Sequence, residues 1–149
     1  MQDDAKRDLS KVRLDLAKER IGFAKEIWKL GDYKTVANRS YYAVFSAMRA
    51  VLALDGFDSR KHSGIVAEFR RRYLKTDLLP TELSFTIDSL IEIRQGSDYD
   101  DFYLISKEEV ATQLARAEEF VNAVEEFLIA QYARNGTSEK ESSQQKGIL

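Results

Sequence analysis

The sequence predicts an all-α protein, an up-and-down bundle of four to five helices. One proline and seven glycines in 149 residues leave few positions that would interrupt a helix. Apolar residues recur at intervals of three and four over most of the chain, which is the helical period. The segment 38–52 is apolar over most of its circumference, and such a helix belongs inside a bundle. We therefore expect this segment at the centre, with the other helices around it.

The first expected helix precedes this central one and is amphipathic. Its apolar stripe also contains an arginine and consists of Leu9, Val12, Leu16, Arg20, Phe23, Ile27 and Leu30. Gly31 is suited to end this helix, and Asp32 is suited to cap the next one. A link this short makes the two helices antiparallel. The second helix is expected to end at Gly56.

Three further helices are expected after a polar loop at 57–64. The third carries its apolar residues at Ile65, Val66, Phe69 and Tyr73. Pro80 is suited to the first turn of the fourth helix, which is expected to end at residues 94–96. A loop rich in acidic and aromatic residues then covers 97–105.

The last helix is expected to begin with a capping box, in which Ser106 and Glu109 bond each other's backbone amides. It continues to about Tyr132. The segment after Asn135-Gly136 is polar and has no apolar pattern. We therefore predict a helical domain over 1–134 and a disordered tail over 135–149.

Composition excludes several kinds of site. With no cysteine and a single histidine, disulfides and thiolate metal sites are excluded and a zinc site is not expected. No cofactor motif is present. No apolar run approaches the roughly 20 residues of a membrane span, and the first residues are too charged for a signal peptide. A cytoplasmic protein without a membrane contact is the expectation.

The net charge of −2 conceals a strong asymmetry along the chain. Residues 33–76 hold nine Lys/Arg against three Asp/Glu, whereas residues 77–131 hold three Lys/Arg against thirteen Asp/Glu. The first interpretation is that these two segments attract each other within the fold. The alternatives are a basic surface that meets phosphate and a match between two copies of the chain.

The residues that could carry chemistry are few. There is no Gly-rich phosphate loop, no spacing of metal ligands and no nucleophile beside a histidine. The remaining candidates are arginines, tyrosines, one histidine and one acid, namely Arg39, Tyr42, Arg49, His62, Arg94, Asp98 and Tyr99.

Two motifs among these residues resemble the HEPN domain (higher eukaryotes and prokaryotes nucleotide-binding). The first is Arg39-Ser-Tyr-Tyr-Ala-Val-Phe45, and the second is Arg94 followed after three residues by Asp98-Tyr99. His62-Ser63-Gly64 at the start of the third expected helix is also similar. The likeness to short, stand-alone prokaryotic members extends from about residue 8 to residue 132.

The resemblance implies a helical bundle that forms homodimers. It also implies pairing with a small nucleotidyltransferase in modules that look like toxin–antitoxin systems. Many members are similar to metal-independent RNases that use Arg-x4-6-His, with the two residues meeting in a dimer cleft. In this sequence the histidine is missing, because positions 99–101 after Arg94 hold Tyr, Asp and Asp.

We therefore predict a non-catalytic module that binds a nucleotide or RNA phosphate. An RNase toxin with an altered site is the alternative, because cleavage without a metal needs a base that titrates near neutrality. A plain homodimeric scaffold is a third possibility. The residues expected to bind phosphate are Arg39, Tyr42, His62, Arg94 and Tyr99, and the catalytic candidates are Arg94, Asp98, Tyr99 and His62.

Each of these residues also has a purely structural interpretation. Arg39 and Arg94 could form buried ion pairs, and for them the two interpretations are equally balanced. Asp98 and Tyr99 are assigned a structural role first. Tyr42 could be a core residue with a bonded hydroxyl, and His62 a local hydrogen-bonding residue. The functional interpretation requires Arg39 and Arg94 to converge from separate helices on one hollow.

Overall fold

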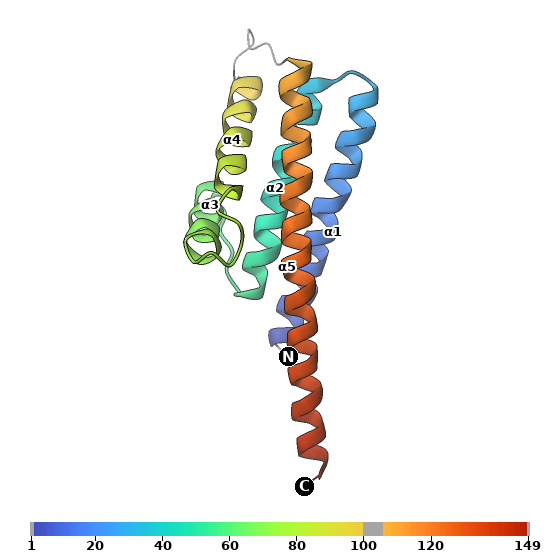
Figure 1. Ribbon diagram of the computed structural model, residues 1–149, viewed down its shortest axis with the longest axis vertical. Helices are drawn as coiled ribbons and strands as arrows, with labels where there is room; N and C mark the ends of the chain where they lie inside the picture. The colour runs from blue at the N-terminus through green and yellow to red at the C-terminus, as the bar shows by residue number, and fades with distance from the viewer. Residues whose placement is uncertain (1, 100–105, 149) are drawn as a thin grey trace.

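The computed structural model describes residues 2–99 and 106–148, with side chains within 3–95 and 106–134, and it confirms the all-α bundle (Figure 1). The helices are α1 (Gln2–Lys29), α2 (Tyr33–Leu54), α3 (His62–Phe69), α4 (Leu83–Tyr99) and α5 (Lys107–Ile148). A π-helical turn at Arg70–Leu74 extends α3. It is closed by a hydrogen bond of 2.9 Å from the Lys75 N–H to the Arg70 carbonyl.

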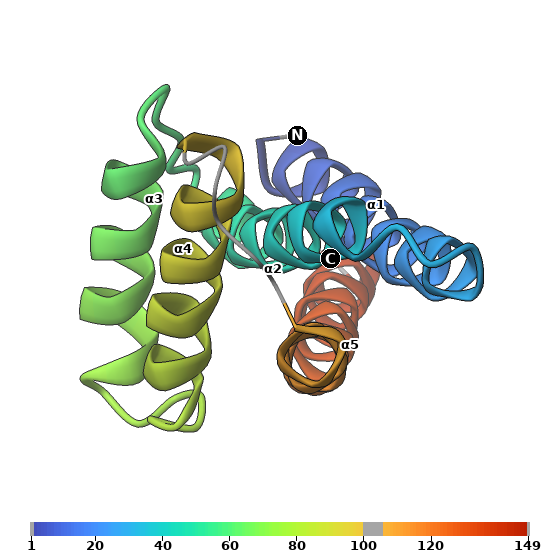
Figure 2. The ribbon, with the colours of Figure 1, turned by 90° about the horizontal axis from the view of Figure 1, so that it is seen from above.

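Helix α2 is the centre of the bundle, as the sequence predicts. Fourteen of its 22 residues are buried. In Figures 1 and 2 it runs between α1 on one side and the α3–α4 pair on the other, while α5 lies alongside. Helix α3 lies across the long axis rather than along it, with α4 beside it (Figure 2). A helix surrounded on so many sides must be apolar nearly all round.

The predicted ends of the first two helices are confirmed. Gly31 has φ +80° and Gly56 has φ +72°, a backbone conformation in which glycine avoids the strain that a Cβ atom would add. Asp32 caps α2 by accepting a hydrogen bond from the Thr35 N–H at 3.2 Å. At the start of α5, the Ser106 hydroxyl accepts from the Glu109 N–H at 3.1 Å.

Two other boundaries differ from the prediction. Pro80 lies before α4 rather than within its first turn, and its carbonyl accepts from the Leu83 N–H at 3.1 Å. Helix α4 continues through Gly96 to Tyr99, because a single glycine weakens a helix without necessarily ending it.

The predicted buried face of α1 is mostly exposed. Relative accessibilities are 43% at Leu9, 62% at Val12, 36% at Leu16 and 52% at Phe23, whereas Ile27 is half-buried and packs on the core. The buried face lies beside this stripe and includes a serine and two alanines as well as two large residues, namely Ser10, Leu14, Ala17, Ile21 and Ala24. Alanines let the α1 and α2 backbones approach closely, so the small-residue face faces the core. The stripe of Leu9, Val12, Leu16 and Phe23 is called the α1 stripe below.

The last helix is longer than the sequence suggests. Its buried side chains extend to Leu128, and the half-buried Tyr132 is the last one packed on the core. The backbone of α5 is helical to Ile148 and projects beyond the bundle (Figure 1). The side chains from residue 135 lie outside the described residues. The division of the chain at residue 134 therefore stays a prediction.

The basic and acidic segments do not mainly pair with each other. Among the described residues, Glu125 and Glu118 of the acidic segment pair with Lys18 and Lys25 of α1, and the first pair is separated by 2.6 Å. In the part of the chain that the structure describes, only Arg70 of the basic segment reaches an acid of the other segment, Asp88. The remaining basic residues with ion pairs use the few acids of their own segment. The ion pairs of the described residues thus give the first interpretation of the charge asymmetry little support, and it stays a prediction.

Candidate functional site

A histidine sits at the start of α3 against the aromatic face of α2. The His62 Nδ1 atom is 3.0 Å from the Tyr41 hydroxyl, and the His62 ring centroid is 4.1 Å from that of Phe45. The neutral imidazole can accept or donate in this hydrogen bond, whereas the protonated ring can only donate. The remaining ring nitrogen, Nε2, has no hydrogen-bond partner among the described residues. The hydrogen bond at Nδ1 therefore orients the His62 ring, and Nε2 remains available to a ligand.

Arg94 of α4 packs on the two tyrosines of α2. Its guanidinium carbon is 4.7 Å from the Tyr41 ring centroid and 5.3 Å from that of Tyr42. Its Nη2 donates a hydrogen bond of 3.1 Å to the Tyr42 hydroxyl. Cation–π contacts of this kind hold a guanidinium in one place. They thereby fix a positive charge at the C-terminal part of α4, beside His62.

Tyr42 is also held from the other side, by Arg20 of α1. The Arg20 guanidinium carbon is 5.6 Å from the Tyr42 ring centroid, and Arg20 donates hydrogen bonds to the Tyr42 carbonyl and the Ser46 hydroxyl. Burial, and then the nearby charge of Arg39, lower the pKa of Arg20 from its ordinary value. Tyr42 is therefore a half-buried ring between two guanidinium groups.

About two turns after Tyr42, Arg49 of α2 shares a single carboxylate with Arg13 of α1. Arg49 Nη2 donates to both oxygens of Asp58, at 3.2 and 3.1 Å, and Arg13 Nη2 donates to Oδ2 at 3.1 Å. Burial alone would raise the pKa of Asp58, but the Ser59 N–H and the Arg49 guanidinium outweigh it and lower the pKa below its ordinary value. Asp58 is thus an ionised carboxylate set among cations.

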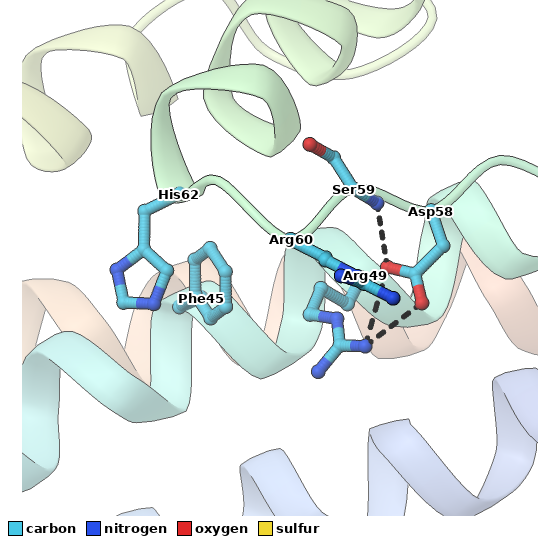
Figure 3. A pocket seen from close by; sticks show the side chains of 6 residues that line it. All are labelled: Phe45, Arg49, Asp58, Ser59, Arg60 and His62. Atoms are coloured by element: carbon cyan, nitrogen blue, oxygen red, sulfur yellow. Dashed lines mark hydrogen bonds and ion pairs between the residues drawn. The ribbon is translucent and has the colours of Figure 1, made fainter.

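Arg49, Asp58 and His62 line a cavity of about 560 Å³, which we call the Arg49 cavity. It is lined by Phe45, Arg49, Asp58, Ser59, Arg60 and His62 (Figure 3). Within the described part of the chain, Arg60 and the Arg49 Nη1 atom have no hydrogen-bond or ion-pair partner. With two arginines against one carboxylate, the cavity wall carries a net positive charge that favours an anion.

The electrostatics of the site keep the imidazole neutral. Burial, followed by the positive charges of Arg94 and Arg49, lowers the pKa of His62 below its ordinary value. Among the described residues, no carboxylate is a cause of this shift. At neutral pH the ring is therefore a neutral group that can accept or donate a proton.

A second cavity, of about 400 Å³, lies on the other side of His62 between α3 and α4. We call it the α3–α4 groove. Its walls include Val66 and Ala67 from α3 and Ile91 and Gln95 from α4, and Arg94 closes it beside His62. His62 is the only residue that lines both cavities among those described.

The predicted site residues are thus brought together only in part. Arg94 donates to the Tyr42 hydroxyl, and the Tyr42 and His62 ring centroids are 6.1 Å apart, so these three residues lie together. His62 and Arg94 line the cavities, whereas Tyr42 lines neither. Arg39 is exposed and has no hydrogen bond or ion pair among the described residues, so it acts on this region through its charge on Arg20 alone. Arg39 and Arg94 were predicted to converge, but no contact joins them among the described residues. The side chains of Asp98 and Tyr99 lie outside those residues, and their roles stay predictions.

Several residues of the site were missed from the sequence. Phe45 lies one turn after Tyr41 on α2, so helical spacing could have identified it. Arg20 interrupts an apolar stripe, which is a signal for a buried or paired cation. The loop residues Asp58, Ser59 and Arg60 offered no such signal, because a polar loop is the ordinary composition of a helix connection.

In the described ranges, no group of three or more His, Cys, Asp or Glu side chains could hold a metal ion. No helix among the residues that were described combines the length and the apolar character needed to span a membrane.

The structure is a helical bundle whose central helix carries Arg-x-Tyr-Tyr, with a later arginine packed on the two tyrosines. These features are the ones on which the resemblance to the HEPN domain is based, and a comparison with protein families gives the same class of protein. The model of the HEPN domain matches residues 10–127. The chain therefore belongs to the HEPN domain family.

Its relatives carry names of two kinds. The chain is 28% identical over 138 residues to a Methanocaldococcus jannaschii protein named "Putative toxin MJ0142", covering 93% of each. It is 32% identical over 112 residues to the "UPF0332 protein" of Thermotoga maritima, covering 75% of this chain and 85% of that protein. A second Methanocaldococcus jannaschii protein, "Putative toxin MJ0605", is 24% identical over 115 residues, covering 77% of this chain and 85% of that protein.

Proposed function

We propose that this HEPN protein binds a phosphate group of a nucleotide or of single-stranded RNA in the Arg49 cavity. The observation that carries the proposal is a set of two arginines and one histidine that line the same cavity. Arg49 Nη1, Arg60 and His62 Nε2 have no hydrogen-bond partner among the described residues. Guanidinium and imidazole groups are the side chains that phosphate oxygens prefer, and backbone-phosphate contacts dominate binding to nucleic acids.

We further propose that the protein is one component of a toxin–antitoxin-like module and pairs with a small nucleotidyltransferase. The toxin names of two relatives support such a module, and the partner is what the family resemblance implies. The uncovered α1 stripe supports the predicted homodimer, since large exposed apolar patches mark interaction surfaces. Growth arrest on expression, relieved by co-expressing the small nucleotidyltransferase encoded beside it, is the expected behaviour of the pair.

We favour binding without catalysis. Cleavage of RNA without a metal needs a base for the 2′-hydroxyl and an acid for the leaving oxygen. The chain has one histidine, and the Nδ1 atom of His62 is already bonded to Tyr41. One imidazole can fill only one of the two roles at a time.

One observation favours the alternative, a metal-independent RNase. His62 is neutral and stands between Arg49 and Arg94, so a base and two phosphate-stabilising cations occupy the same cleft. Incubation of single-stranded RNA with the protein and a chelator tests this directly. Cleavage that disappears in both His62→Ala and Arg94→Ala would replace the binding proposal with the enzymatic one.

The binding proposal is tested by fluorescence anisotropy with a labelled single-stranded RNA. We expect Arg49→Ala and Arg60→Ala each to weaken binding roughly tenfold, because each removes a positive charge that lines the Arg49 cavity. The matched control is Arg116→Ala on α5, whose guanidinium lies 4.9 Å from the Phe85 ring centroid and lines neither cavity. An equal loss in all three variants would indicate unspecific charge attraction and contradict a site at His62.

A further inference from the structure

The far end of α3 is tied to the end of α2 through a single carboxylate. Asp55, the C-cap residue of α2, accepts a hydrogen bond of 2.6 Å from the Tyr73 hydroxyl at its Oδ2 atom. Arg72 Nη1 lies 3.4 Å from the same oxygen. Burial, and then the neighbouring Asp55 carboxylate, raise the pKa of Tyr73 above its ordinary value, so the hydroxyl stays protonated and donates. Asp55, Arg72 and Tyr73 are called the Asp55 cluster below.

Arg72 extends this cluster onto the connection between α2 and α3. Its guanidinium carbon is 5.1 Å from the ring centroid of Phe57, and its Nε donates a hydrogen bond of 2.7 Å to Glu68 Oε2. Phe57 itself packs on the core, and its N–H donates to the Leu52 carbonyl at 3.1 Å. The first residues of the connection, 55–57, are therefore held from both helices.

Two members of the cluster belong to the π-helical turn at the end of α3. Arg72 and Tyr73 are consecutive residues of that turn, and both reach one oxygen of Asp55. π-Helical turns are rare and occur frequently at functional sites. Neither Arg72 nor Tyr73 lines the Arg49 cavity or the α3–α4 groove, so any effect of these two residues on those cavities is indirect.

The connection that the Asp55 cluster holds also forms a wall of the Arg49 cavity. Residues 58–60 follow Phe57 directly, and all three line the cavity (Figure 3). The side-chain hydrogen bonds within this loop are local: the Ser59 N–H donates to Asp58 Oδ1 at 2.9 Å, and the Lys61 N–H donates to Ser59 Oγ at 3.2 Å. Such bonds fix the shape of a loop. Its place on the bundle has to be set by contacts that reach other elements.

That place is set at both ends of the loop and in its middle. At the far end, His62 is bonded to Tyr41. In the middle, Asp58 is bonded to two arginines, of which Arg49 is the one that a bound phosphate would engage. At the near end, the bonds of the Asp55 cluster use no residue that lines the cavity, so they can persist when an anion replaces Asp58 at Arg49.

We propose that Asp55, Arg72 and Tyr73 are positioning residues, which hold residues 58–60 against α2 so that the Arg49 cavity is formed before an anion enters. The inference rests on the proposed phosphate site and adds how that site is preorganised. A loop that is already in its binding conformation loses less conformational freedom on binding. The apparent affinity of the site is proportional to the fraction of molecules in which the loop is in place.

Tyr73→Phe tests the proposal, because it removes the hydroxyl from the cluster and keeps the buried ring. The matched control is Tyr132→Phe, since that hydroxyl is also 2.6 Å from its partner, Ser10, and Tyr132 lines neither cavity. Amide hydrogen exchange is first measured on the full-length proteins without ligand. In Tyr73→Phe we expect the Ser59 and Lys61 amides to exchange roughly tenfold faster than in the control, because the loop leaves its place more often.

Binding of inorganic phosphate is then followed by the NMR shifts of the loop amides. Tyr73→Phe and Asp55→Ala are each expected to bind roughly tenfold more weakly than the wild type, which corresponds to a loop that is in place about one tenth of the time. Tyr132→Phe should bind as the wild type does. Asp55→Asn keeps an oxygen that accepts from the Tyr73 hydroxyl, so it should bind within about twofold of the wild type.

The possible results separate this inference from the function on which it rests. Loop exchange rates in Tyr73→Phe that match those of Tyr132→Phe would overturn the positioning role, because any change would then follow overall stability. Wild-type phosphate affinity in Tyr73→Phe would overturn it as well. So would a loss in Asp55→Asn as large as in Asp55→Ala, because the hydrogen bond would then not be what holds the loop. If the wild type binds no phosphate while the loop of Tyr73→Phe exchanges faster, the proposed function fails and the positioning role stands.

Discussion

At the scale of single residues, His62 reports on the charge of the site. Its pKa lies below the ordinary value of about 6.5, because burial and the charges of Arg94 and Arg49 disfavour the protonated ring. An anion bound in the Arg49 cavity would offset those charges. We expect phosphate to raise the pKa of His62, as measured from the imidazole proton shifts in an NMR titration. A pKa that does not move at saturating phosphate would contradict binding beside this ring.

The same shift makes folding stability depend on pH. The pKa of His62 is lower in the folded protein than in the unfolded chain, so the unfolded chain binds the proton more readily. The free energy of unfolding is therefore not reduced by this residue above about pH 6.5. Stability is then lost as the pH falls from there through the folded pKa. In His62→Gln, the melting temperature should change less with pH over this interval. The comparison is with the wild type in the same buffers.

Asp58 competes with any anion that enters the cavity. Its carboxylate engages both Arg49 and Arg13, so it occupies charges that a phosphate would use. Asp58→Asn keeps an oxygen for the Ser59 N–H and removes the negative charge. We expect phosphate and RNA to bind roughly tenfold more tightly to this variant, as measured by anisotropy competition. Because half of the Asp58 side chain is exposed, at 51%, the stability should change by about 1 kcal/mol or less.

At the scale of the helix, the α1 stripe leads to a prediction about assembly. Val12 and Phe23 are 62% and 52% exposed, so charges at these positions should leave the fold intact. We expect the double variant Val12→Glu, Phe23→Glu to be monomeric by size-exclusion chromatography with light scattering, and the wild type to be dimeric. Leu78→Glu, which changes a comparably exposed leucine outside α1, is the control. A monomeric wild type would contradict the predicted homodimer.

The helix scale also shows how far sequence reasoning reaches. Glycine, aspartate and serine act at helix ends through local backbone geometry, so Gly31, Asp32, Gly56 and Ser106 could be placed from the sequence. The buried face of α1 could not, because periodicity gives a stripe but does not say what covers it. The partners in the site depend on how α3 crosses the bundle, so the contact between His62 and Tyr41 was not predictable from motifs.

At the scale of the whole molecule, the end of the core can be tested by truncation. Tyr132 is the last of the described hydrophobic side chains that pack on the core, and its hydroxyl is 2.6 Å from that of Ser10, which itself bonds the Ala50 carbonyl. A chain ending at Arg134 should melt within about 2 °C of the full-length protein.

A chain ending at Ala130 loses the Tyr132 ring and its hydrogen bond to Ser10, and should be destabilised by about 1–3 kcal/mol. Both truncations are measured by circular dichroism melting. A large effect of the shorter deletion would show that residues beyond 134 belong to the folded domain, against the predicted division.

The position of α2 has a consequence for how ligand binding can be observed. This one helix supplies Tyr41, Tyr42, Phe45 and Arg49 to the site, and it is also the most enclosed element of the core. Its amides should exchange with deuterium only when the entire protein unfolds. A bound ligand should therefore slow exchange most visibly in the connection between α2 and α3, while protection along α2 rises only as much as global stability does.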